Sequence, residues 1–224
     1  MKQEVIPVQS MSARKEKNAD LIRPKRLRFP DEERENEWLG ILLDAYYLGD
    51  KCVFEGISKR IKRGEQLACK KGCSSCCSTH STIPTYPLEI IGIYWYTDTK
   101  IKGETRVRLA QNLISYNQLN QCPFLIDGAC SIHPMRPLAC RFFNVFNSPC
   151  APGEDPFYSR RKDVLTPNEQ EKQKALSKYL HFHGIRGKKA VKVALKTDIL
   201  NNYVKNLREI DWKNLGIRLN LRLI

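Results

Sequence analysis

Seven cysteines form two groups whose residue type and spacing suit a metal site. The first group places four thiols within the stretch CKKGCSSCC: Cys69, Cys73, Cys76 and Cys77. The second group supplies three more: Cys122, Cys130 and Cys140. A C-x2-C loop bends two sulfurs toward one ion at a zinc–sulfur distance of about 2.3 Å, and residues far along the chain complete the tetrahedron. The pattern predicts a metal site assembled from two cysteine motifs.

The ligand count leaves several kinds of centre open. Seven thiols exceed the four ligands of one closed zinc site. The surplus is compatible with two nearby ions, with an iron–sulfur cluster that has spare thiols, or with a partly open site. Adjacent side chains tend to diverge, so we expect that Cys76 and Cys77 do not bind one ion together. Thiolates bind both zinc and iron, so both metals remain candidates.

Other cysteines and histidines are weaker candidates. Cys52 lies among apolar residues of a helical stretch and is predicted to be a buried hydrophobe. Cys150 follows the second group and is a possible ligand, as is His133 beside Cys130. His80 is a possible outer-shell group. The two histidines of HFHG, at 181 and 183, are expected to point to different faces of a helix.

Four cations lie close to the cysteines in sequence: Lys70, Lys71, Arg136 and Arg141. Such groups can lower thiol pKa values or donate hydrogen bonds to sulfur. We therefore expect some of them to compensate the negative charge of metal-bound thiolates.

Length and cysteine usage indicate a cytoplasmic protein without a membrane span. At 224 residues the chain can bury a core without disulfides. The cysteine count of nine is odd, and the N-terminal residues lack the apolar run of a signal peptide. The longest apolar stretches fall short of the roughly 20 residues that cross a bilayer. Dense cysteines in a reducing compartment are more often metal ligands or redox groups than disulfides.

The positive charge divides the chain into three predicted parts. Residues 1–30 carry 8 Lys and Arg against 3 Asp and Glu, residues 31–156 carry 14 against 15, and residues 157–224 carry 16 against 6. We interpret these as a basic flexible arm, a cysteine-cluster metal-binding domain and a basic helical extension. The basic termini are possible contact sites for a protein or nucleic-acid partner.

The elements that must position the cysteines are expected to be mostly helical. Apolar periodicity predicts one helix from Asp31 and a second through FEGISKRIKRGE, ending before the first motif. Two more are expected after it, beginning near Pro87 and over GETRVRLAQNLISYNQL, and only PMRPLACRFF could form a helix within the second motif. Thr166, Pro167 and Glu169 predict a capping box.

The C-terminal part has weaker signals. A helix is expected over residues 188–207, and the alternating tail GIRLNLRLI is compatible with a strand or an amphipathic helical end. The predicted fold is mostly α, a small helical domain built around a cysteine-rich loop. A βαβ alternation is absent from the pattern.

CKKGCSSCC followed by CPFLIDGACSIHPMRPLACRFF resembles a known family. It is the cysteine-cluster family labelled YkgJ-like, which is described as chelating zinc or iron and shares its pattern with flagellin lysine N-methylases. The resemblance covers roughly residues 69–150. It implies that the seven cysteines of the two groups are family cysteines and that Arg136, Pro137 and Arg141 accompany them.

Three functions follow as hypotheses. The first is a metal-binding cysteine-cluster protein. The second is an iron–sulfur-dependent modifying enzyme, such as one with lysine N-methylase-like activity, because Cys69-x3-Cys73-x2-Cys76 has radical-enzyme spacing; Ser75 and the missing strand–helix alternation count against it. The third is a nucleic-acid-binding zinc protein that uses SRRKD and HGIRGKKAVKVALK as phosphate contacts.

Overall fold

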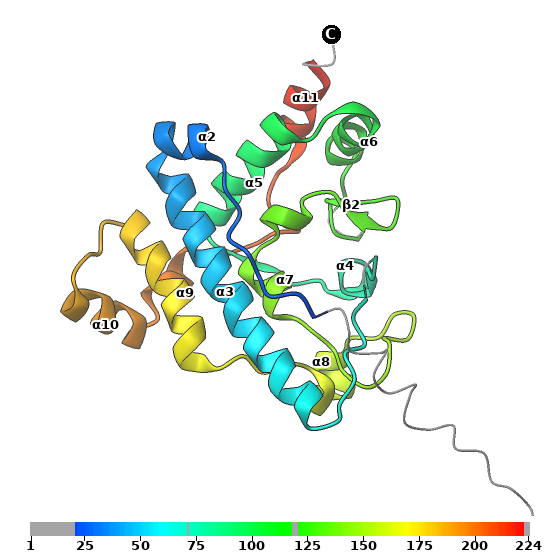
Figure 1. Ribbon diagram of the computed structural model, residues 1–224. Helices are drawn as coiled ribbons and strands as arrows, with labels where there is room; N and C mark the ends of the chain where they lie inside the picture. The colour runs from blue at the N-terminus through cyan, green and yellow to red at the C-terminus, as the bar shows by residue number, and fades with distance from the viewer. Residues whose placement is uncertain (1–20, 71, 118–120, 222–224) are drawn as a thin grey trace, which may run out of the picture.

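The computed structural model describes residues 21–70, 72–117 and 121–221 and shows a largely helical chain (Figure 1). The predicted mostly α fold is confirmed. Two pairs of very short strands complete it. β1 (Pro84–Thr85) pairs antiparallel with β4 (Lys205–Asn206), and β2 (Leu125–Ile126) pairs antiparallel with β3 (Ala129–Cys130).

The longest element is α3 (Glu37–Lys62), which follows the short helix α2 (Pro30–Glu35). Its buried face includes Leu39, Leu42 and Tyr46, and α9 (Glu169–Phe182) packs along it. The expected break before FEGISKRIKRGE is absent, and Gly49 lies inside the continuous helix α3. A Cβ at Gly49 would lie 2.6 Å from Leu138 Cδ2, so glycine lets the cysteine-bearing segment approach α3 closely.

Two apolar cores flank the cysteine-rich region. One is formed by α3, α9 and the start of α5 (Pro87–Lys100), together with Met135 and Leu138 of the second motif. The other combines α5 and α6 (Gly103–Ile114) with α11 (Lys213–Leu221) and includes Cys122 and Phe124. Because the second motif contributes side chains to both cores, its backbone is held at the junction between them.

The cysteine-rich region holds short helices. They are α4 (Ser75–Thr79), η1 (His133–Met135) and α7 (Leu138–Phe142). After them come α8 (Pro156–Ser159) and η2 (Arg161–Asp163). The helix expected within PMRPLACRFF is thus present as η1 and α7.

The capping box predicted at Thr166 is wrong. α9 begins two residues later than expected, and Asn168 is its N-cap: the Asn168 side-chain oxygen accepts a hydrogen bond of 3.1 Å from the Glu171 N–H. Asparagine is as good an N-cap residue as threonine, so the sequence contains two possible N-cap positions for this helix, Thr166 and Asn168.

The C-terminal elements are shorter than predicted. The helix expected over 188–207 is α10 (Lys188–Lys196) followed by η3 (Ile199–Tyr203), separated by Asp198 with φ of 48°. The tail is helical, because α11 buries Leu215 and Leu219 against α6. Residues 222–224 of the tail and 118–119 of the helix predicted over GETRVRLAQNLISYNQL lie outside the described residues.

Residues 21–29 of the expected basic arm contact the helices. Arg26 Nε donates to Asp44 Oδ1 at 2.7 Å and its Nη2 donates to Glu33 Oε2 at 2.9 Å. Phe29 packs edge-on against Trp95, with ring centroids 5.0 Å apart. Residues 1–20 of that arm lie outside the described residues, and the division into three parts stays a prediction.

Candidate metal centre

The first cysteine group lies on a loop that begins beside the end of α3. Leu67 forms an isolated antiparallel bridge with Phe146, which sets the start of the loop against the segment that follows α7. Gly72 turns the chain with φ of 83°, a conformation that glycine adopts without strain. Cys76 and Cys77 then lie in the first turn of α4. The loop therefore places Cys69 and α4 on either side of a tight turn.

The expectation that Cys76 and Cys77 diverge is wrong. A hydrogen bond between the two thiols, with burial, raises the pKa of Cys76. Neighbouring side chains on a one-turn helix can meet when both lean toward the same side. The pair therefore supplies two adjacent sulfurs to one face of the loop.

The second group is built on a hairpin and a helix. Asp127 and Gly128 have φ of 50° and 73°, which closes the two-residue turn between β2 and β3. Cys130 ends this hairpin, and Cys140 lies in α7. Cys122 precedes the hairpin and is buried.

The fold brings the two groups together. The Cys122 N–H donates to the Cys77 carbonyl oxygen at 2.8 Å, which joins the motifs through their backbones. Burial raises the pKa of Cys140 well above its usual value, and neighbouring thiols act in the same direction. These neighbours are Cys122, Cys76 and Cys130. The interaction of Cys140 with Cys76 therefore reaches from one motif to the other.

Cys76 interacts electrostatically with thiols of both groups. A negative charge on Cys76 would raise the pKa of four other thiols: Cys69, Cys122, Cys130 and Cys150. In each of them, burial raises the pKa more than the charge of Cys76 does. Burial raises the pKa of Cys69 to about 11 and that of Cys122 to about 12. Without a bound metal ion these two thiols keep their protons at neutral pH.

Three of these sulfurs also face backbone donors. The Val145 N–H donates to Cys69 Sγ at 3.3 Å. The backbone of Phe124 at Cys122 and that of Ile132 at Cys130 hydrogen-bond the sulfur and hold the thiol pKa below what burial alone would give. Hydrogen bonds to sulfur favour the thiolate, the form that binds metal.

The two remaining cysteines differ from each other. Cys150 interacts with the thiols of Cys69, Cys73 and Cys76, so the structure adds it to the neighbourhood of the site. Cys52 is 3% exposed on α3, and its thiol donates to the Asn168 carbonyl oxygen at 3.7 Å, as predicted for a buried hydrophobe. Only the residue type of Cys150 pointed to it in the sequence, because its position depends on the loop after α7.

The histidines have other partners than the thiols. His133 Nε2 lies 2.7 Å from Arg136 Nη1, and burial followed by the charge of Arg136 lowers the pKa of His133 to about 4. His80 Nε2 lies 3.3 Å from Asp155 Oδ1, and its ring packs edge-on against Phe143. The His183 ring stacks on Tyr203 beyond the end of α9.

Arginines surround the thiols more closely than lysines do. The charges of Arg136 and Arg141 oppose the rise in the pKa of Cys130 that burial causes. The charge of Arg208 lowers the pKa of Cys122, and the charge of Arg160 lowers the pKa of Cys150. Arg208 also donates a hydrogen bond of 2.8 Å to the His80 carbonyl oxygen. Arg208 and Arg160 were missed, because they come from the C-terminal third. Lys70 is exposed, and Lys71 lies outside the described residues.

The donor set fits a metal that prefers sulfur. Buried thiols, backbone donors to sulfur and nearby guanidinium groups are the surroundings in which metal thiolates are stable. Among the described residues, no three or more Cys, His, Asp or Glu side chains are already arranged to hold an ion. The thiols are therefore neighbours that must draw together on binding.

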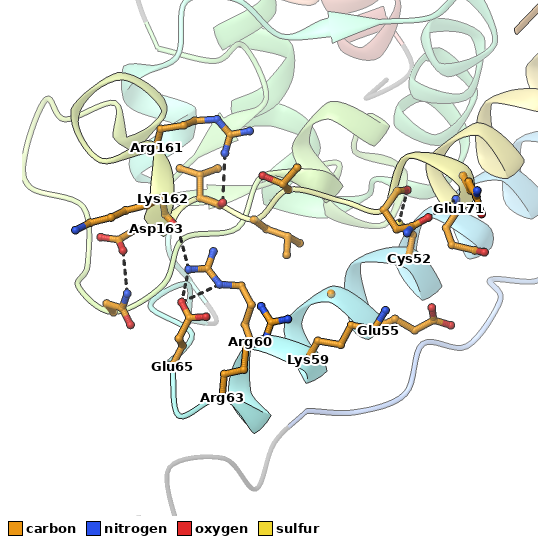
Figure 2. A pocket seen from close by; sticks show the side chains of 17 residues that line it. Cys52, Glu55, Lys59, Arg60, Arg63, Glu65, Arg161, Lys162, Asp163 and Glu171 are labelled. Atoms are coloured by element: carbon orange, nitrogen blue, oxygen red, sulfur yellow. Dashed lines mark hydrogen bonds and ion pairs between the residues drawn. The ribbon is translucent and has the colours of Figure 1, made fainter. Parts of the chain in front are cut away.

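A large cavity in the described part of the chain lies elsewhere. It has a volume of about 1310 Å³ and follows the C-terminal half of α3, with Lys59, Arg60 and Arg63 on one side and Arg161 to Asp163 opposite (Figure 2). Arg60 Nε donates to Glu65 Oε2 at 2.8 Å. Cys52 is the one cysteine in its lining, so this cavity is separate from the thiol cluster.

Comparison with known proteins agrees with the cysteine pattern. Residues 68–178 match the model of the CxxCxxCC family, described provisionally as a zinc- or iron-chelating domain. The matched segment, which contains α4 to α8 and most of α9, is similar to that family. No curated protein and no solved structure matches the chain. None of the described helices combines the length and apolar character that a membrane span requires.

Proposed function

We propose that the protein binds zinc or iron through thiolates of both cysteine motifs. The observation that carries the proposal is the position of Cys76 among thiols of both groups, with backbone donors facing Cys69, Cys122 and Cys130. The proposed ligand set is the seven motif cysteines, with Cys150 as an eighth candidate.

A bound ion would supply a fixed positive charge and sulfur–metal bonds that join the segments. The chain's own contribution is to bring these segments together. The Cys122–Cys77 backbone hydrogen bond sets the distance between the motifs, and Arg136, Arg141 and Arg208 offset the charge of the thiolates. These features support metal binding and require no reaction at the site.

The experiment is metal analysis of protein purified without oxygen. We expect zinc or iron bound to the wild type, and a visible spectrum distinguishes an iron–sulfur cluster, which is brown, from colourless zinc. C76S and C130S should each lose most of the metal, because they remove a thiol from each half of the cluster. C52S is the matched control and should retain it, since Cys52 lies outside the cluster. A folded C130S protein with full metal content would contradict the two-motif site.

The two other hypotheses gain no support. The family match is to a chelating domain. In the SRRKD segment, Arg160 already pairs with Glu154 at 2.8 Å and with Asp163 at 3.2 Å, so part of its positive charge is neutralised within the protein.

A further inference from the structure

A groove lined by α10 and by the segments on either side of it combines an apolar floor with a basic rim. α10 lies at the edge of the molecule, beside α9 (Figure 1). The groove has a volume of about 740 Å³. Its floor includes Ile185, Val193, Ala194 and Ile199. Val193 is 55% exposed, which is high for a large apolar side chain on a short helix that also packs on a core.

The rim carries positive charge that has little compensation within the protein. Arg186, Lys188 and Lys189 line the groove, and none of the described residues that line it is acidic. Arg186 pairs weakly with Glu37 at 3.7 Å, and both side chains are exposed. In the described part of the chain, Lys188 and Lys189 form no ion pair. An exposed apolar hollow with an unbalanced basic rim is typical of a binding surface rather than of a solvated helix face.

We propose that this groove binds an acidic peptide segment of a partner protein, with an apolar anchor side chain seated against Val193. Charge complementarity selects the partner, because carboxylates on both sides of the anchor would meet Arg186, Lys188 and Lys189. A helix or turn with an apolar anchor is a common way to fill such a hollow.

Two other negatively charged ligands, an anionic membrane and single-stranded nucleic acid, fit the groove less well. A helix that binds a membrane surface points its apolar side chains outward into the lipid. Here most of the apolar residues line a hollow, and Ala194 is only 6% exposed. Single-stranded nucleic acid needs aromatic side chains on which bases stack, and the described lining contains none.

The test begins with a phage-displayed library of random 16-residue peptides, selected for binding to the full-length protein. The most enriched peptide is then synthesised, and its affinity for the protein is measured by fluorescence anisotropy. We expect enriched peptides that combine Asp or Glu with Leu, Ile or Phe. Their affinity should fall at least tenfold in V193D and in K188E/K189E, and should also fall with added salt. I217D, on exposed Ile217 of α11, and K102E are the matched controls and should bind as the wild type does.

The proposal is overturned if no peptide is enriched, if the enriched peptides lack acidic residues, or if V193D binds them unchanged. It is also overturned if phosphatidylserine vesicles or polyuridylate bind through Val193 while peptides do not. Circular dichroism and metal content of V193D should equal those of the wild type. This separates failure of the groove from failure of the proposed metal site.

Discussion

At the scale of single residues, buried Glu89 connects three helices. Its Oε2 accepts the Tyr86 N–H at 2.8 Å at the start of α5. Its Oε1 accepts the Leu138 N–H at 2.7 Å at the start of α7, and the Tyr179 hydroxyl of α9 at 2.8 Å. Glu89 thereby positions the short helix that carries Cys140, although it is not itself a candidate ligand.

Glu89 should make the stability of the protein depend on pH. Burial raises its pKa from 4.5 to about 7, so the folded state holds this proton more tightly than the unfolded state. The stabilising contribution is complete below pH 4.5 and is lost as the pH rises to about 7. Relative to E89Q, the unfolding free energy of the wild type should fall by about 2 to 3 kcal/mol between pH 5 and pH 8. Urea denaturation at the two pH values measures it.

The control for this titration is E37Q, because Glu37 is the first residue of α3 and its side chain is exposed. Its stability should follow that of the wild type at both pH values. If the difference in unfolding free energy between E89Q and the wild type is the same at pH 5 and pH 8, Glu89 has the same pKa in the folded and unfolded states, and the prediction is wrong.

Arg141 should be required for its shape as well as its charge. It is 4% exposed, and it donates to Asp50 Oδ2 at 2.7 Å and to the Arg136 carbonyl oxygen at 2.9 Å while lying over the Tyr46 ring. Lysine cannot make these divergent contacts at once. We expect R141K to lower the unfolding free energy by about 2 to 4 kcal/mol.

Arg34 provides the comparison for R141K. Its pair with Asp31 is 76% and 81% exposed. R34K should therefore change stability by less than about 0.5 kcal/mol, because exposed ion pairs contribute little. Equal effects of the two substitutions in thermal or urea denaturation would contradict a buried anchoring role for Arg141.

At the scale of elements, α11 rests on α6 through a glycine. A Cβ at Gly216 would lie 2.9 Å from the Ala110 carbonyl oxygen and 2.9 Å from the Ile114 amide nitrogen. Both are backbone atoms, so neither can move away as a side chain would. The close approach lets Leu215 and Leu219 reach the core shared with Cys122.

G216A should therefore destabilise the protein by about 1 to 3 kcal/mol, because the two helices must separate. G40A tests the same substitution where α3 has room: the nearest atom to its Cβ would be Glu33 Oε2 at 3.7 Å. There alanine should stabilise by up to about 1 kcal/mol through its helix propensity. The two variants should shift the denaturant midpoint in opposite directions, and shifts of the same sign would contradict this account.

At the scale of the whole molecule, the thiol cluster joins segments from distant parts of the chain. The loop after α3, the hairpin of β2 and β3, and α7 all contribute thiols. Because two of these segments also pack into the apolar cores, metal binding should stabilise the entire fold rather than one loop.

Removing the metal should therefore lower the melting temperature. At a free metal concentration of one hundred times Kd, binding adds about 2.7 kcal/mol. For a chain of this length that corresponds to a fall of roughly 5 to 10 °C after treatment with a chelator. C76S should melt at one temperature with and without chelator, whereas C52S should show the wild-type shift. If chelator leaves the melting temperature of the metal-loaded wild type unchanged, metal binding and folding are not coupled.

The sequence by itself determined the helical class and both cysteine motifs. Periodic apolar residues specify α6 and the first half of α3 locally, since a helix needs only neighbours three and four positions away. The thiol spacing likewise depends on residue type alone. The resemblance to a chelating family rested on these same residues, and the family match confirms it.

Tertiary structure decided which side chains meet. The contact between Cys76 and Cys77, the approach of Cys150, and the place of Arg208 beside Cys122 depend on packing between segments far apart in sequence. The close approach of Leu138, from the second motif, to Gly49 of α3 is likewise a tertiary contact. Such contacts arise from the burial of both cores at once, and no local pattern encodes that arrangement.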